Sequence, residues 1–140
     1  MQRIMDDVVA EKVSSLQRCV LRAREEHRLS GKTFARNFTR QDAAILNIVR
    51  ACELAIDLAS YTVRQKRLGI PGTSAEAFEM LRAADIIDES LSERMVRMVG
   101  FRNLVIHAYR KVDLAIVVSV IVDRLDDVIA FGDRVLGLTD

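Results

Sequence analysis

The stretch that decides the fold runs from residue 90 to residue 109 and reads SLSERMVRMVGFRNLVIHAY. Its apolar residues recur at alternating steps of four and three, the spacing of one face of an α-helix, and these residues are Leu91, Met95 and Met98. The same spacing continues to Arg102 and then, through Val105, to Tyr109. The stretch therefore predicts a helix that carries a guanidinium and a phenol on a core or interface seam.

Arg102 and His107 cannot both face this seam on a straight helix. An unpaired buried charge costs several kcal/mol, so the guanidinium of Arg102 needs a compensating partner. At about 100° per residue, His107 lies roughly 140° around the helix from Arg102, and an unbroken helix does not make the two converge. Two explanations stay open. Either the helix bends near Gly100, where glycine weakens a helix, or a second copy of the chain completes the site.

The rest of the sequence predicts further helices and no strands. Two stretches interrupt the helical pattern, Ser30-Gly31 and the segment 68–72, which holds the only proline. Helix starts are predicted at residues 39–42, at Thr73-Ser74-Ala75-Glu76 and at Ser90-Leu91-Ser92-Glu93, the last two as capping boxes. The expected helices span about 2–28, 39–67, 73–81, 90–109 and 113 to the end.

We therefore predict an all-α fold, an up-and-down bundle of about four long helices plus one short helix, in a single domain over residues 1–140. Half of the residues are hydrophobic although 29% are charged, and this surplus suggests a homodimer or another oligomer. The net charge of +1 excludes the broad basic surface of a general nucleic-acid binder, so any RNA contact needs a local basic cleft.

Cysteine usage and hydropathy predict a soluble, cytoplasmic protein that does not enter a membrane. Cys19 and Cys52 lie far apart in the sequence, as expected for two buried thiols in a reducing compartment. No N-terminal apolar run resembles a signal peptide, and no apolar run reaches the roughly 18 residues of a membrane span.

Several charged residues have plain alternative explanations. Arg50, Glu53 and Asp57 recur one turn apart on one helix, either as a solvated charge ladder or with Asp57 as the partner of Arg102. His27 lies at the charged end of the first helix and is expected to be solvated. The acids at positions 85, 88 and 89 lack a histidine at ligand spacing, so we expect no metal and no cofactor.

The pattern Arg102-x4-His107-x-Tyr109, with Asn103 directly after the arginine, resembles the signature of HEPN-domain proteins, specifically the HepT-like toxins. The segments Arg50–Ala59, Pro71–Ser74 and Glu76–Phe78 also resemble this family, so that the likeness covers almost the whole chain. It implies the toxin of a type II-like toxin–antitoxin module, a ribonuclease that forms a homodimer. It also implies an MntA-type nucleotidyltransferase antitoxin as partner, which neutralises the toxin by attaching AMP to Tyr109.

If the motif cleaves RNA without a metal, each residue has a chemical role. His107 can move a proton near neutral pH, and Arg102 offers a planar fork to the phosphate oxygens. Asn103 can orient the histidine or the phosphate, and Tyr109 can bind a phosphate oxygen or pair with Arg102. On a continuous helix Tyr109 would lie about 20° from Arg102 and two turns along, close enough for an attached AMP to cover the arginine.

Two other interpretations remain open. In a purely structural one, Arg102 and Tyr109 form a buried hydrogen-bonded pair at a dimer seam, and His107 caps that pair. In another class of function, the protein is a non-catalytic subunit that binds nucleotides or substrates for a nucleotidyltransferase. The motif would then bind a phosphate without breaking a bond.

Overall fold

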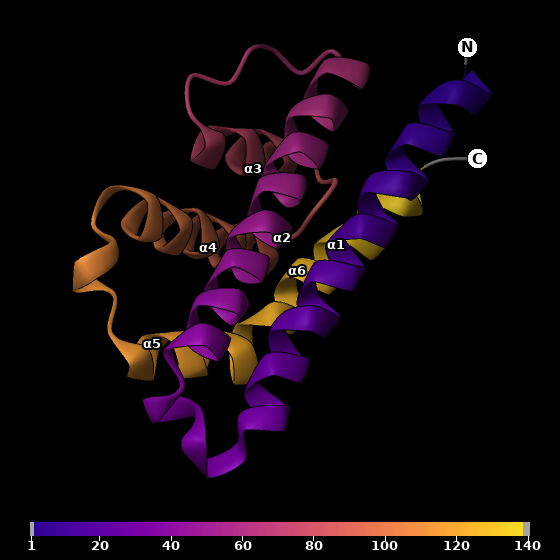
Figure 1. Cartoon of the computed structure of the whole chain (residues 1–140). Coiled ribbons are helices and arrows are strands. Elements are labelled where there is room, and N and C mark those ends of the chain that lie inside the picture. Colours follow the sequence, from indigo (N-terminus) through magenta and orange to yellow (C-terminus); the bar gives the residue numbers. More distant parts are fainter. Residues whose placement is uncertain (1, 139–140) are drawn as a thin grey trace.

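The computed structural model describes residues 2–138, with side chains from residue 5 onward, so that residues 1, 139 and 140 of the expected domain lie outside it. The described residues form helices and contain no strand, which confirms the all-α prediction (Figure 1). The α-helices are α1 (Gln2–Ser30), α2 (Phe38–Gln65), α3 (Ser74–Ala83), α4 (Glu89–His107), α5 (Leu114–Ser119) and α6 (Leu125–Leu136). Shorter turns are η1 (Gly31–Arg36), η2 (Tyr109–Lys111) and η3 (Val120–Arg124).

Helices α1 and α2 lie side by side as a long hairpin, and the other helices pack around it (Figure 1). α6 contacts both members of the hairpin, while α4 contacts α2, α3 and α6. The core at their centre includes Phe78 of α3 and Phe131 of α6, whose fully buried rings meet edge to face at 5.0 Å between centroids. This core holds α4 against α2, which is the contact on which the candidate site depends.

The hairpin turn follows from two local features of the sequence. Gly31, with a φ of 52°, takes the left-handed conformation that ends α1, as the Ser30-Gly31 prediction requires. The cap of α2, however, is Asn37, whose side chain accepts a hydrogen bond from the Arg40 backbone N–H at 3.0 Å. The predicted cap at residues 39–42 is wrong, because Asn37 already satisfies the free N–H groups and α2 begins at Phe38.

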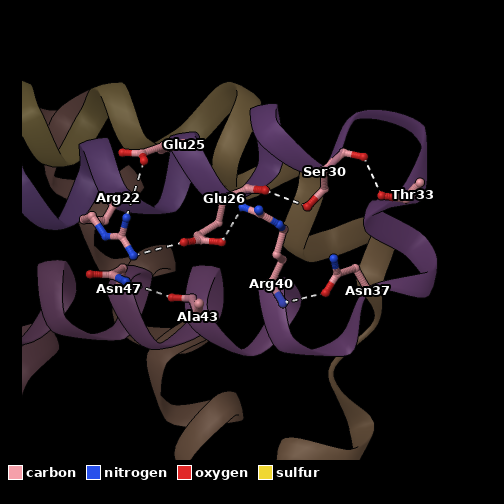
Figure 2. A network of polar contacts seen from close by, with 9 residues as sticks. All are labelled: Arg22, Glu25, Glu26, Ser30, Thr33, Asn37, Arg40, Ala43 and Asn47. Atoms are coloured by element: carbon pink, nitrogen blue, oxygen red, sulfur yellow. Dashed lines mark hydrogen bonds and ion pairs between the residues drawn. The ribbon is translucent and has the colours of Figure 1, made fainter.

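A buried carboxylate joins the end of α1 to the start of α2, and Figure 2 shows its partners. Glu26 is 8% exposed. It accepts hydrogen bonds from Arg22 at 3.0 Å within α1 and from Arg40 of α2 at 3.1 Å. Next to this network His27 packs edge-on against Phe34 at 5.0 Å between centroids and is partly buried, which corrects the expectation of a solvated His27. The closed end of the hairpin is therefore fixed by charge as well as by apolar contact.

The start of α3 agrees with the sequence and the start of α4 does not. Thr73 Oγ1 accepts from the Glu76 N–H at 3.1 Å, and the Glu76 carboxylate accepts from the Gly72 N–H at 3.1 Å. α4 is capped by Asp88, which accepts from the Leu91 N–H at 2.7 Å. The predicted capping box at residues 90–93 is wrong, since Asp88 begins the helix before Ser90 can act as its cap.

The predicted C-terminal helix is divided by a π turn. η3 contains i→i+5 hydrogen bonding between α5 and α6, so one residue is added to the helical path there. Val120 and Ile121, which lie in this turn, are both buried, and so are Val117 before it and Leu125 after it. The π turn lets neighbouring apolar residues face the same core. None of the helices that the structure describes combines the length and apolarity that a membrane span requires.

The Glu26 network predicts a stability difference between two adjacent acids. Glu26→Ala should lower the free energy of unfolding by about 1–3 kcal/mol, because two arginines lose a charged acceptor that is mostly buried. Glu25→Ala is the matched control, since Glu25 is 43% exposed and pairs with Arg22 alone at 3.5 Å, and its effect should stay below about 0.5 kcal/mol. Urea unfolding followed by circular dichroism measures both. Equal effects of the two changes would contradict this account.

Candidate functional site

Arg102 projects from α4 toward α2, where Glu53 receives it. The Nε of Arg102 donates to Glu53 Oε1 at 2.8 Å, and Nη2 donates to Oε2 at 3.2 Å, so the carboxylate is held through both oxygens. The Nη1 donates to the side chain of the neighbouring Asn103 at 2.8 Å. Arg102 is 23% exposed at its side chain and Glu53 is 42% exposed. The pair thus lies at the edge of the core and is open to solvent on one side.

This arrangement leaves part of the guanidinium free. A guanidinium carries five N–H donors, and Glu53 and Asn103 engage three of them in the bonds described. One N–H on each of Nη1 and Nη2 remains for another acceptor. Hydrogen bonding to Glu53 raises the pKa of Arg102 above its ordinary value, which keeps the group charged. Chemically, the site offers an oriented cation with two spare donors, a match for a phosphate.

The interpretation that Asp57 pairs with Arg102 is wrong in this structure. Asp57 lies one turn beyond Glu53 on α2 and pairs instead with Lys12 of α1 at 3.6 Å. The carboxylate is 58% exposed there. Because α4 meets α2 at the level of Glu53, the acid one turn earlier receives the guanidinium. The charge ladder predicted from the sequence contained the true partner, but one helix turn cannot be resolved without the packing of the two helices.

His107 is the last residue of α4 and its side chain is exposed. The helix runs without interruption through Gly100, and a Cβ placed on Gly100 would meet nothing within 4 Å. The α-helix is therefore not interrupted at this glycine, and no other backbone of the described chain approaches it closely. His107 stays about 140° around the helix from Arg102. No hydrogen bond or ion pair to its imidazole occurs within residues 5–138.

Tyr109 does not continue the face of α4 that carries Arg102. The helix ends at His107, Ala108 takes a φ of −147° and a ψ of 50°, and Tyr109 begins the short turn η2. The expected position two turns along the helix from Arg102 is wrong, and so is the structural interpretation in which these two residues form a buried pair. The reason is local: once Ala108 leaves helical geometry, the spacing that aligned the residues no longer applies.

The phenol of Tyr109 instead meets the second turn of α2, where its hydroxyl donates a hydrogen bond to Asp42 Oδ1. That bond to the carboxylate, together with partial burial, raises the pKa of Tyr109 to about 12. The tyrosine is 47% exposed, so the hydroxyl lies at the surface. It borders a shallow hollow whose other walls are Gln41 and apolar residues, Phe38, Ile45, Val112, Leu114 and Val117.

A second nucleophilic group lies near Arg102 and is inert. Burial raises the pKa of the Cys52 thiol to about 12, so it stays neutral, and its sulfur lies 3.9 Å from the Met98 carbonyl oxygen. Cys19 is free as well and only partly buried, which corrects the expectation of two buried thiols. Across residues 5–138 no group of three or more His, Cys, Asp or Glu side chains is placed to hold a metal ion.

The comparisons with known proteins now decide the family. The family model described as "Ribonuclease HepT-like" matches residues 10–135, which is most of the chain. The chain belongs to the HepT-like ribonuclease family. This confirms the resemblance that the Arg102-x4-His107-x-Tyr109 motif carries.

Two known proteins are similar to the chain, one over nearly its full length and one over about half of it. The chain is 38% identical over 129 residues to the mRNA nuclease HepT of Shewanella oneidensis, covering 92% of this chain and 96% of that protein. A putative RNase of Archaeoglobus fulgidus is 32% identical over 73 residues, 52% of this chain and 54% of the relative.

Solved toxin–antitoxin structures contain the same fold. The tri-AMPylated Shewanella oneidensis HEPN toxin in complex with MNT antitoxin superposes with a TM-score of 0.88 at 37% identity, over 94% of this chain and 98% of that chain. A toxin–antitoxin complex with AMP-PNP gives a TM-score of 0.87 at 36% identity, over 92% and 98% of the two chains.

The contact between Tyr109 and Asp42 predicts how the pKa of Tyr109 responds when the Asp42 carboxylate is removed. Asp42→Asn should lower the pKa of Tyr109 from about 12 toward the ordinary value of 10, because a neutral amide no longer favours the protonated phenol. Phenolate absorbance reports it cleanly, since the chain has two tyrosines and no tryptophan, and a Tyr61→Phe background leaves Tyr109 alone. A titration of Tyr109 that is unchanged by Asp42→Asn would show that the hydrogen bond does not form in solution.

Proposed function

We propose that this protein is the toxin of a toxin–antitoxin pair and a metal-independent ribonuclease that cleaves RNA with Arg102 and His107. The observation that carries the proposal is the oriented guanidinium of Arg102, which keeps two free N–H donors, on the same helix as an exposed imidazole. Membership in the HepT-like ribonuclease family and the likeness to an mRNA nuclease support it. As a soluble cytoplasmic protein it would meet RNA directly.

The cleavage step uses groups of the substrate and of this chain. The 2′-hydroxyl of the RNA attacks the adjacent phosphorus, the O2′–P bond forms, and the bond from phosphorus to the 5′-oxygen breaks. His107 takes the proton of the 2′-hydroxyl, a protonated His107 gives a proton to the leaving 5′-oxygen, and Arg102 stabilises the negative charge that builds on the phosphate oxygens. Asn103 supports the site by holding Nη1 of Arg102. The products carry a 2′,3′-cyclic phosphate end and a 5′-hydroxyl end.

A homodimer completes this proposal, because α4 alone cannot make Arg102 and His107 converge. The helix is continuous through Gly100, so no interruption of α4 at that residue unites them. The outer face of α4 presents Gly100, where a second backbone has room to approach, with Arg97 and His107 exposed on the same side. Two copies facing each other across this face of α4 would bring two His107 side chains together, whereas Arg102 lies about 160° away around the helix and would join the cleft from its solvent-open edge.

The dimer has a direct measurement. Light scattering at micromolar concentration should give the mass of two chains. Gly100→Leu should shift the population to monomer while leaving helicity unchanged, because the added side chain meets nothing within its own chain but would stand between the two helices. A monomer of the unsubstituted protein at these concentrations would overturn the proposed assembly.

The catalytic assignment is tested by expressing the chain alone. Wild type should arrest growth and produce RNA fragments with 2′,3′-cyclic phosphate ends, and His107→Ala should abolish both, since proton transfer contributes about 10²–10⁴-fold. His27→Ala is the matched control, because His27 lies outside the motif and packs on Phe34 at the C-terminal end of α1. Growth arrest by a folded His107→Ala variant would exclude this role and favour the alternative, a non-catalytic subunit that binds nucleotides or substrates.

Glu53 should act by positioning Arg102. Glu53→Gln keeps one acceptor oxygen but cannot accept from both Nε and Nη2, so we expect kcat to fall about 10-fold or more. The KM for RNA should not rise, because the change removes a negative charge beside the phosphate site. Arg102→Lys should lower kcat further, since an ammonium reproduces neither the two-bond contact with Glu53 nor a bidentate contact with a phosphate. Asp57→Asn on the same helix is the control and should leave kcat unchanged; an undiminished kcat in Glu53→Gln would refute the positioning role.

The partner we propose is an MntA-type nucleotidyltransferase antitoxin that attaches AMP to Tyr109. The structural relative is a tri-AMPylated toxin bound to an MNT antitoxin, and Tyr109 is the exposed tyrosine of this chain at the end of the motif. AMP on this phenol adds bulk and negative charge two residues from His107. A tethered anion at that place would compete with RNA phosphate at high effective concentration.

A further inference from the structure

The contact between α2 and η2 brings the carboxylate of Asp42 to the hydroxyl of Tyr109. We propose that Asp42 is the general base of the modification reaction, accepting the phenolic proton of Tyr109 when AMP is attached. The inference rests on the proposed function, since it requires that Tyr109 be the residue that the nucleotidyltransferase modifies. It goes further by placing part of the catalytic machinery of that reaction in the toxin itself.

The geometry is that of a nucleophile with its base already bound. The Tyr109 hydroxyl donates its proton to Asp42 Oδ1, so the lone pairs of the phenolic oxygen remain free for attack. Asp42 and Tyr109 are the two ionisable residues among those that line the hollow, and the other lining residues are Gln41 and apolar side chains. The acceptor that holds the proton of Tyr109 is therefore the one ionisable side chain that shares the hollow with it, the Asp42 carboxylate.

The need for a base follows from the acidity of the phenol. In the free toxin the Asp42 carboxylate and partial burial hold the pKa of Tyr109 near 12, so almost no phenolate exists at neutral pH. A reaction through preformed phenolate would be slow. Transfer of the proton to Asp42 as the new bond forms avoids that free phenolate, which is how general base catalysis raises the rate.

The step balances without a further reactant besides ATP, which the partner supplies. The phenolic oxygen of Tyr109 attacks the α-phosphorus of ATP, and the Oη–P bond forms. The bond from that phosphorus to the bridging oxygen of the β-phosphate breaks, and pyrophosphate leaves with the electron pair. The phenolic proton passes to Asp42 Oδ1 and from there to solvent, to which the exposed Asp42 is open.

Tyr61, the other tyrosine of the chain, lacks the features that favour reaction at Tyr109. The hydroxyl of Tyr61 is buried and has no hydrogen-bond partner among the side chains that the structure describes. Its hydroxyl has neither the access to solvent nor the hydrogen bond to a carboxylate that the hydroxyl of Tyr109 has. Selection of Tyr109 over Tyr61 is therefore a property of the toxin's own surface, whatever the partner adds.

The experiment measures the rate of AMP attachment to the full chain by the purified MntA-type nucleotidyltransferase with ATP, by intact mass and by peptide analysis, over a range of pH. Asp42→Asn keeps an acceptor oxygen for the phenol but removes the base. At about pH 7 it should be modified at least 10-fold more slowly than wild type, and the gap should close as the pH rises and phenolate forms. Asp57→Asn, an acid on the same helix without a tyrosine, should match wild type.

The other outcomes are decisive as well. Asp42→Asn modified at the wild-type rate, or slowed by one constant factor at every pH, would overturn the role as base, the second result indicating a purely positional one. Circular dichroism and binding of the nucleotidyltransferase establish that the variant is folded. If wild type itself gains no AMP at Tyr109, the proposed function fails at this point, and the inference fails with it, a result separate from any difference between the variants.

Discussion

A guanidinium at the edge of a helical core needs an acceptor for its charge, and in this protein Glu53 provides it. The bond is held through both carboxylate oxygens, across the interface of α2 and α4. A partly exposed ion pair stabilises a fold little, because solvent screens the charges and two long side chains lose freedom. Its value here is geometric. Glu53 and Asn103 fix the direction of the guanidinium, and every role considered for Arg102 requires that fixed direction.

The hydrogen bond between Tyr109 and Asp42 also joins a donor to a carboxylate of α2, but it differs in kind from the bond between Arg102 and Glu53. Arg102 and Glu53 are both charged, whereas Tyr109 offers Asp42 a neutral hydroxyl whose proton can be given up. In the proposed modification, esterification would remove that proton, so the modified tyrosine could not donate to Asp42 and would place an anion beside it. An AMP on Tyr109 and the Tyr109–Asp42 hydrogen bond would thus be mutually exclusive states of the segment between α4 and α5.

Helix type, breakers and core residues could be read from the sequence because they depend on local periodicity. The spacing of Leu91, Met95 and Met98 correctly placed the buried face of α4, and Thr73 correctly marked the start of α3. Errors arose where a local rule met a contact between distant segments. Helical spacing carried Tyr109 onto the face of Arg102, but the chain leaves the helix at Ala108. The choice of Glu53 over Asp57 depends on where α4 crosses α2, and the contact of Asp42 with Tyr109 depends on where η2 returns to that helix.

The order of these contacts along the chain has a kinetic consequence. α1 and α2 are consecutive helices joined by the short turn η1, so their association closes a small loop and costs little chain entropy. The bonds from Arg102 to Glu53 span 49 residues and that from Tyr109 to Asp42 spans 67. Both must wait until α4 has packed on a hairpin that already exists. During synthesis, the segment with the motif is also made after the helix that receives it. In a newly made chain the two helices of the hairpin that receives these contacts are therefore complete before the residues of the candidate site have all been added.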